Sequence, residues 1–118
     1  MYDAYRDQAA FLTVYIKEAH PTDEWQMSSN ERDGVCYPQP RTLDDRIAIV
    51  RDFTERYSYR VPMLVDRTDN AADEAYAAWP ERLYVIDERG IVAYKGAVGP
   101  FGYEPEEVES WLAARFKP

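Results

Sequence analysis

The sequence predicts a single α/β domain spanning residues 1–118. Apolar segments rich in Val, Ile, Tyr or Phe occur at residues 10–19, 62–66, 82–87 and 90–96, and segments of helical periodicity separate most of them. The chain of 118 residues has the length of one ordinary domain. Its hydrophobic content of 46% is sufficient for a core, and no repeat or linker divides it.

The first predicted elements are a short helix over residues 2–8 and a strand over residues 10–19. The strand sequence "AFLTVYIKEA" is almost continuously apolar, which favours a strand buried on both faces. Residues 20–41 contain several prolines and one glycine, so we expect a long irregular connection, of a kind that is often functional.

A helix is predicted from Thr42, which forms a capping pair with Asp45. The apolar positions at helical spacing are Leu43, Ile47, Val50, Phe53 and Tyr57. The segment "PMLVD", residues 62–66, is then a second short strand.

The remaining elements are a helix, a hairpin and a last helix. Asn70 and Asp73 are expected to cap a helix that runs to Trp79 and ends before Pro80. The segments 82–87 and 90–96 are spaced as a hairpin whose turn contains Gly90. Pro105 begins the last helix, and its predicted inner face consists of Val108, Trp111, Leu112 and Arg115.

This order of elements indicates a mixed sheet. A strand–helix–strand unit favours parallel neighbours with a right-handed crossover, and the hairpin adds antiparallel pairing. With helices on both faces, the arrangement is a three-layer fold that resembles thioredoxin. The first strand of that fold and most of its first helix are missing from the chain.

The charge of the chain excludes several kinds of partner. A formal net charge of -8 repels nucleic acid and anionic membrane surfaces. No apolar run approaches the roughly 18 residues that a membrane span requires, and the N-terminus does not resemble a signal peptide. We therefore expect no membrane segment, and we take the cytoplasm as the default location.

Metal and hydrolytic chemistry are also disfavoured. The one histidine, His20, and the one cysteine, Cys36, lack the spacing of a metal site, so we expect no metal. No serine lies in a nucleophile elbow, and "GPFGY" lacks the lysine of a phosphate-binding loop.

Three segments carry a resemblance to a known family. They are "VYIKEAHPTDEW" (14–25), "AAWPERLYVID" (77–87) and "YKGAVGPFGYEPEEVESWL" (94–112). In this order they resemble the iodothyronine deiodinases and their bacterial relatives. The resemblance implies an oxidoreductase that removes halogen from a small aromatic substrate by selenol or thiol chemistry. It also implies a thiol reductant as cosubstrate and no bound cofactor.

The resemblance places the selenocysteine or cysteine nucleophile upstream of Met1, so we expect a chain truncated at its N-terminus. Ordinary gene prediction reads a selenocysteine codon as a stop, which would produce such a start. Two further departures concern residues of vertebrate members: Pro40 stands where they have a second histidine, and a cysteine near Val61 is absent.

His20 and Glu18 are the candidate catalytic residues. His20 follows a predicted parallel strand, where ligands tend to lie, and Pro21 favours an extended conformation for it. The resemblance makes His20 a substrate anchor or proton donor; the alternative is a histidine that fixes the following loop. Glu18 lies on the same strand face and is either the group that orients the imidazole or the partner of an arginine.

Arg82 and Trp25 are the other candidate substrate contacts. The resemblance pairs Arg82 with His20 in a clamp on the substrate's polar ends, and the alternative is an ordinary salt bridge. Cys36 is a possible thiol, although no CxxC motif or neighbouring histidine lowers its pKa. Glu81 stands where thioredoxin-like proteins usually have a cis proline, one position after Pro80.

Two other functions remain open. One is a binding module without catalysis, whose missing central strand would leave exposed edges that favour a homodimer. The other is a peroxiredoxin-like peroxidase, which needs the same upstream thiol or selenol.

Overall fold

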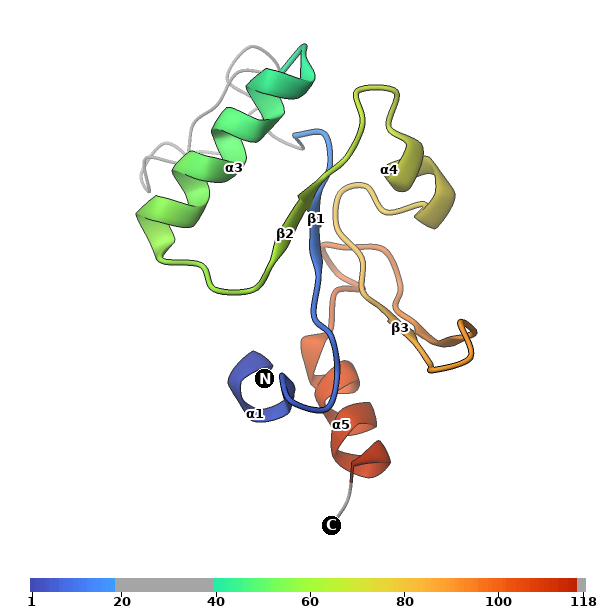
Figure 1. Ribbon diagram of the computed structural model, residues 1–118. Coiled ribbons are helices and arrows are strands. Elements are labelled where there is room, and N and C mark those ends of the chain that lie inside the picture. Colours follow the sequence, from blue (N-terminus) through green and yellow to red (C-terminus); the bar gives the residue numbers. More distant parts are fainter. Residues whose placement is uncertain (19–39, 117–118) are drawn as a thin grey trace. The chain divides into compact units, whose positions relative to one another are not determined.

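A parallel pair of strands and an antiparallel hairpin form the β-structure of the described residues (Figure 1). The structure is a computed structural model that describes residues 1–18 and 40–116. Its elements in chain order are α1 (Tyr2–Tyr5), β1 (Thr13–Tyr15), α3 (Leu43–Tyr57), β2 (Met63–Val65), α4 (Ala71–Tyr76), β3 (Tyr84–Ile86), β4 (Val92–Lys95) and α5 (Pro105–Arg115). This alternation confirms the α/β class. The described residues divide into two compact units, residues 12–76 and residues 1–11 with 77–116.

The unit of residues 12–76 is built on the parallel strands β1 and β2. Thr13 pairs with Met63 and Tyr15 with Val65, which confirms the predicted parallel neighbours. Helix α3 lies against β2, and the Thr54 hydroxyl contacts the Met63 sulfur at 3.7 Å. The prediction that β1 is buried on both faces is wrong, because Val14 is 40% exposed. Helix α3 covers one face of the pair, and Val14 belongs to the other.

Helix α3 begins as the sequence predicts. The Thr42 hydroxyl accepts a hydrogen bond from the Asp45 amide at 3.1 Å, so the capping pair is confirmed. Of the five predicted inner positions only Val50 is buried, while Leu43 and Tyr57 are exposed at the two ends of the helix. The helix ends at Ser58, whose backbone is left-handed, with φ 49°.

Helix α4 is shorter than predicted. It ends at Tyr76, and Ala77 has a φ of 47°, a left-handed conformation that stops the helix before Trp79. The predicted Asn70 cap is also wrong, because Asn70 itself has a φ of 61° and its amide oxygen accepts from another side chain. The Trp79–Pro80 and Gly99–Pro100 peptide bonds are cis.

The other unit contains the predicted hairpin of β3 and β4, with Gly90 in its turn at φ 79°. The Asp87 carboxylate fixes the turn by accepting from the amides of Arg89 and Ile91 at 2.9 and 3.0 Å.

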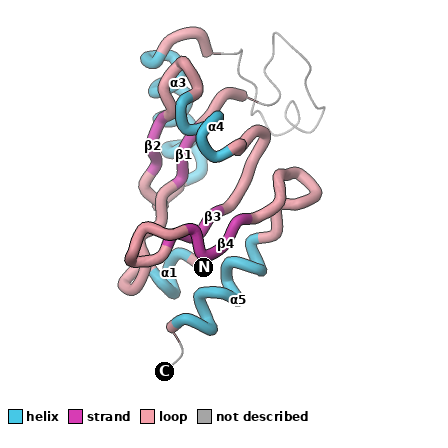
Figure 2. Tube along the Cα trace, turned by 90° about the vertical axis from the view of Figure 1, so that its right-hand side faces the viewer, coloured by secondary structure: helices cyan, strands magenta, loops and turns pink. Residues whose placement is uncertain are grey.

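Helix α5 lies alongside this hairpin (Figure 2). It begins at Pro105 as predicted and buries Val108 and Leu112, which are 7% and 3% exposed. Trp111, predicted as core, is only half-buried. Arg115 keeps its guanidinium at the surface, where it pairs with Glu88 at 3.2 Å.

The single mixed sheet that we expected is present as two separate pairs within the described part of the chain. The order of elements fits part of the thioredoxin-like fold.

Candidate functional site

Two acidic residues follow the carboxyl ends of the parallel strands. Glu18 comes three residues after the end of β1, and Asp66 directly follows β2. Ligands of parallel sheets bind beyond this edge. The Tyr15 hydroxyl donates to Glu18 Oε1 at 2.7 Å, so the carboxylate is held at the strand end by its own strand.

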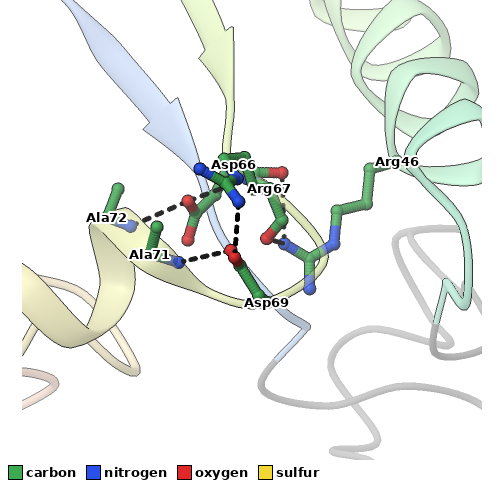
Figure 3. Close-up of polar contacts among 6 residues, drawn as sticks. All are labelled: Arg46, Asp66, Arg67, Asp69, Ala71 and Ala72. Atoms are coloured by element: carbon green, nitrogen blue, oxygen red, sulfur yellow. Dashed lines mark hydrogen bonds and ion pairs between the residues drawn. The ribbon is translucent and has the colours of Figure 1, made fainter.

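Asp66 is the most extensively bonded carboxylate at this edge (Figure 3). It is 4% exposed, and its two oxygens accept from the backbone amides of Arg67, Ala72 and Asp73 at 2.8, 2.9 and 3.0 Å. Two of these amides belong to the first turn of α4, where backbone N–H groups lack partners within the helix. Asp66 therefore caps α4. The sequence had led us to expect Asn70 and Asp73 in this role.

The pKa of the Asp66 carboxyl lies below its ordinary value. Burial alone raises this pKa, because it disfavours the charged form. The backbone amides of Ala72, Asp73 and Arg67 donate to the charged form, and the positive charge of Arg46 adds to their effect. Together these contributions outweigh burial, so Asp66 is an anion in neutral solution.

Arg46, in the first half of α3, binds the same loop from the opposite side (Figure 3). It is 4% exposed. Its Nη1 donates to the carbonyls of Asp66 and Arg67 at 3.3 and 2.8 Å, and its Nη2 donates to the Asn70 side chain at 2.8 Å. Its Nε has no acceptor among the described residues. The interactions fix the loop after β2 to α3.

Arg82 lies in the other unit, directly before β3. Its Nε donates to the Gly96 carbonyl at 2.7 Å, and its Nη1 donates to the Ala77 carbonyl at 3.1 Å. Its guanidinium carbon is 5.8 Å from the centre of the Tyr84 ring. No ion pair joins Arg82 to an acid within residues 1–18 and 40–116.

The other predicted site residues lie outside the described residues. These are His20, Trp25 and Cys36. Glu18 and Arg82 belong to different units, and the predicted clamp of Arg82 with His20 stays a prediction.

The sequence reasoning overlooked Arg46 and Asp66. A signal for Asp66 was present, because an acid directly after the strand "PMLV" is placed to cap the next helix.

The described residues contain neither a group of metal ligands nor a membrane-spanning helix. No three His, Cys, Asp or Glu side chains within this part of the chain are grouped to bind a metal ion. None of its helices combines the length and the apolar character needed to cross a membrane.

Comparison with known proteins gives one consistent result. Residues 1–116 match the sequence profile of a family described as iodothyronine deiodinase. The chain is 43% identical over 104 residues to a type I iodothyronine deiodinase of Xenopus laevis, covering 88% of the chain and 39% of that protein. It is 39% identical over 110 residues to a type II iodothyronine deiodinase of Rattus norvegicus, covering 92% and 41%.

A thyroxine 5-deiodinase of Bos taurus is 36% identical over 108 residues, covering 92% of the chain and 34% of that protein. The chain thus spans about two fifths or less of the length of these relatives.

Proposed function

We propose that this chain, which belongs to the iodothyronine deiodinase family, is part of an oxidoreductase that removes iodine from an iodinated aromatic compound. The observation that carries the proposal is the family match from residue 1 to residue 116. It is supported by the type I, type II and thyroxine 5-deiodinase relatives, which are named for deiodination of iodothyronines or thyroxine.

The proposed reaction is a reductive dehalogenation in which a selenolate or thiolate attacks iodine. The carbon–iodine bond breaks, a selenium–iodine or sulfur–iodine bond forms, and the ring carbon keeps the electron pair and takes a proton. A thiol reductant then displaces iodide, and a second thiol releases the enzyme by exchange. Two thiols are oxidised to a disulfide while one carbon–iodine bond is reduced. We propose that the nucleophile lies upstream of Met1, as the resemblance to the deiodinases implies.

We assign Arg82 to the carboxylate of the substrate. A guanidinium has five N–H donors in a fixed plane, and among residues 1–18 and 40–116 the carbonyls of Gly96 and Ala77 occupy the Nε and Nη1 positions. The remaining donors are suited to a carboxylate. In the same proposal Glu18 orients the His20 imidazole, which anchors the substrate or donates the proton, and Trp25 contacts the ring.

The assignment of Arg82 is tested by replacement with lysine. Arg82→Lys keeps the charge but loses the planar fork, so we expect the Kd for 3,5-diiodo-L-tyrosine to rise roughly tenfold. Arg89→Lys is the matched control, because Arg89 lies in the hairpin turn of the same unit with its side chain 77% exposed. Calorimetric titration measures both. Equal affinity of the Arg82 variant and the wild type would show that Arg82 does not bind the carboxylate.

The source of the nucleophile is tested by reading the DNA upstream of the Met1 codon. We expect an in-frame TGA or Cys codon within a strand-like segment. The protein extended to include it should release iodide from an iodinated aromatic compound when supplied with a thiol, and the 118-residue chain should not. If the 118-residue chain does release iodide and its Cys36→Ser variant does not, Cys36 is the nucleophile instead.

Two further proposals concern the surroundings of the protein. We place the reaction in the cytoplasm, because that compartment keeps low-molecular-weight thiols reduced. Recovery of the protein with membranes would contradict this.

We also propose a homodimer, since the two-stranded sheets are too small to be stable alone and their outer edges can pair. Sedimentation at a monomer mass would exclude it.

A further inference from the structure

The loop after β4 is bonded to the segment that carries Arg82. We call residues 96–103 the glycine loop. The Gly96 amide donates to the Leu83 carbonyl at 2.9 Å, and the Gly99 amide donates to the Glu81 carbonyl at 2.8 Å. Since Arg82 Nε also donates to the Gly96 carbonyl, the loop and the guanidinium are held by the same few backbone groups.

The glycine loop is tightly packed. A Cβ atom at Gly99 would lie 2.5 Å from Glu81 Oε1, and one at Gly102 would lie 2.5 Å from the Ala97 Cβ. The Gly102 amide closes the loop by donating to the Val98 carbonyl at 3.2 Å. The loop therefore has a defined shape, and the residue between Pro100 and Gly102 is presented from a fixed backbone.

That residue is Phe101, whose side chain is 97% exposed. Phenylalanine is among the residues most often buried, and a large exposed aromatic side chain leaves its contact surface available to a ligand. Packing within the loop does not explain why a phenylalanine stands at this position, because Phe101 makes no ring contact with any described residue.

Phe101 is also close to Arg82 along the bonded backbone. Consecutive Cα atoms are about 2.9 Å apart across the cis Gly99–Pro100 bond and about 3.8 Å apart across the next bond, so the Phe101 Cα lies within about 7 Å of the Gly99 Cα. The Gly99 amide is hydrogen-bonded to Glu81, the residue before Arg82. The loop thus brings an aromatic face and a cationic fork into the same neighbourhood. An aromatic amino acid has the complementary pair of groups, a ring and a carboxylate.

We propose that Phe101 contacts the ring of the aromatic substrate and contributes to specificity, while Arg82 binds the carboxylate. This inference rests on the proposed function. Offset or edge-to-face contact between aromatic rings accounts for the choice of residue. A lipid surface is a weaker interpretation of the exposed ring, because the net charge of -8 opposes an anionic membrane.

The test is a calorimetric titration of the 118-residue chain with 3,5-diiodo-L-tyrosine. Phe101→Ala should raise its Kd roughly fivefold to tenfold, and Phe101→Trp should bind within about twofold of the wild type. Ile91→Ala is the matched control, because Ile91 is 54% exposed at the hairpin turn of the same unit and should leave the Kd unchanged. Circular dichroism melting checks that all variants are folded.

Each other outcome overturns a stated part of the reasoning. If Phe101→Ala binds like the wild type while Arg82→Lys binds weakly, the role of Phe101 is wrong and the proposed function stands. If the wild type does not bind, both are wrong. If Phe101→Ala keeps its Kd but no longer binds phosphatidylcholine–phosphatidylserine vesicles that the wild type binds, Phe101 is a lipid contact instead.

Discussion

Removing the Asp66 carboxylate should destabilise the unit of residues 12–76 more than removing any surface acid. We consider Asp66→Ala, which leaves the amides of Arg67, Ala72 and Asp73 without their acceptor. A hydrogen bond to a charged group contributes about 1.5–3 kcal/mol, and loss of a helix cap costs about 0.5–2 kcal/mol. Water can replace part of the lost hydrogen bonding, and the contributions are not additive. We therefore expect Asp66→Ala to lower the free energy of unfolding by about 3 kcal/mol.

The assay is urea unfolding followed by circular dichroism, with hydrogen exchange of the Ala72 and Asp73 amides as the local measurement. Asp69→Ala is the matched control, because Asp69 also accepts from an α4 amide, at 3.2 Å, but its side chain is 56% exposed. We expect the control to lose less than about 1 kcal/mol. If Asp66→Ala and Asp69→Ala unfold at the same urea concentration, the inferred importance of the buried cap is refuted.

The lowered pKa of Asp66 adds a pH dependence to this prediction. The folded state binds the Asp66 proton less tightly than the unfolded state, whose pKa is near the ordinary 3.8. The stabilisation is therefore complete above that pKa and is lost as the pH falls through the lower folded-state pKa. The difference in free energy of unfolding between the wild type and Asp66→Ala should shrink below pH 3.8. A difference that grows there would contradict the lowered pKa of Asp66.

Two further predictions concern backbone conformation. Ser58→Gly should stabilise the protein by about 0.5 kcal/mol in urea unfolding, since Ser58 has a φ of 49°, whereas Ser110→Gly within α5 should destabilise it by a similar amount. A loss of stability in Ser58→Gly would contradict the left-handed cap. Gly99→Ala should cost about 1–2 kcal/mol by overpacking against Glu81, and this cost should largely vanish in a Glu81→Ala background. An unchanged cost in that background would show that the clash lies elsewhere.

The sequence predicted those features of the fold that depend on neighbouring residues. The Thr42 cap, the Gly90 turn and the Pro105 helix start each involve groups only a few positions apart, and all three are confirmed. Because a cap or a turn is decided by local hydrogen bonds and local φ values, the pattern of residue types is enough to locate it.

The end of α4 is a local feature that was predicted three positions too late, at Trp79 in place of Tyr76. Two other errors concern contacts between distant residues. Arg46 was not singled out from the sequence, because its acceptors at Asp66 and Arg67 are 20 and 21 positions away. Val14 looked like a fully buried residue, but only one face of the β1–β2 pair is covered by α3. Burial depends on which elements meet, and the residue pattern of one segment does not contain that information.

A comparison of the two arginines shows how exposure separates a structural residue from a candidate ligand contact. Arg46 and Arg82 both donate to two backbone carbonyls, so the types of contact do not distinguish them. Arg46 is 4% exposed and uses both of its terminal nitrogens within the protein, so a substrate cannot reach it without disrupting the loop after β2. Arg82 is half-buried, and its Nη2 has no acceptor in the part of the chain that the structure describes. A guanidinium that is fixed at two nitrogens and open at the third is already oriented for a carboxylate, which lowers the entropy lost on binding. This reasoning makes Arg82 the residue at which a lysine substitution should affect substrate binding, and Arg46 the residue at which it should affect stability.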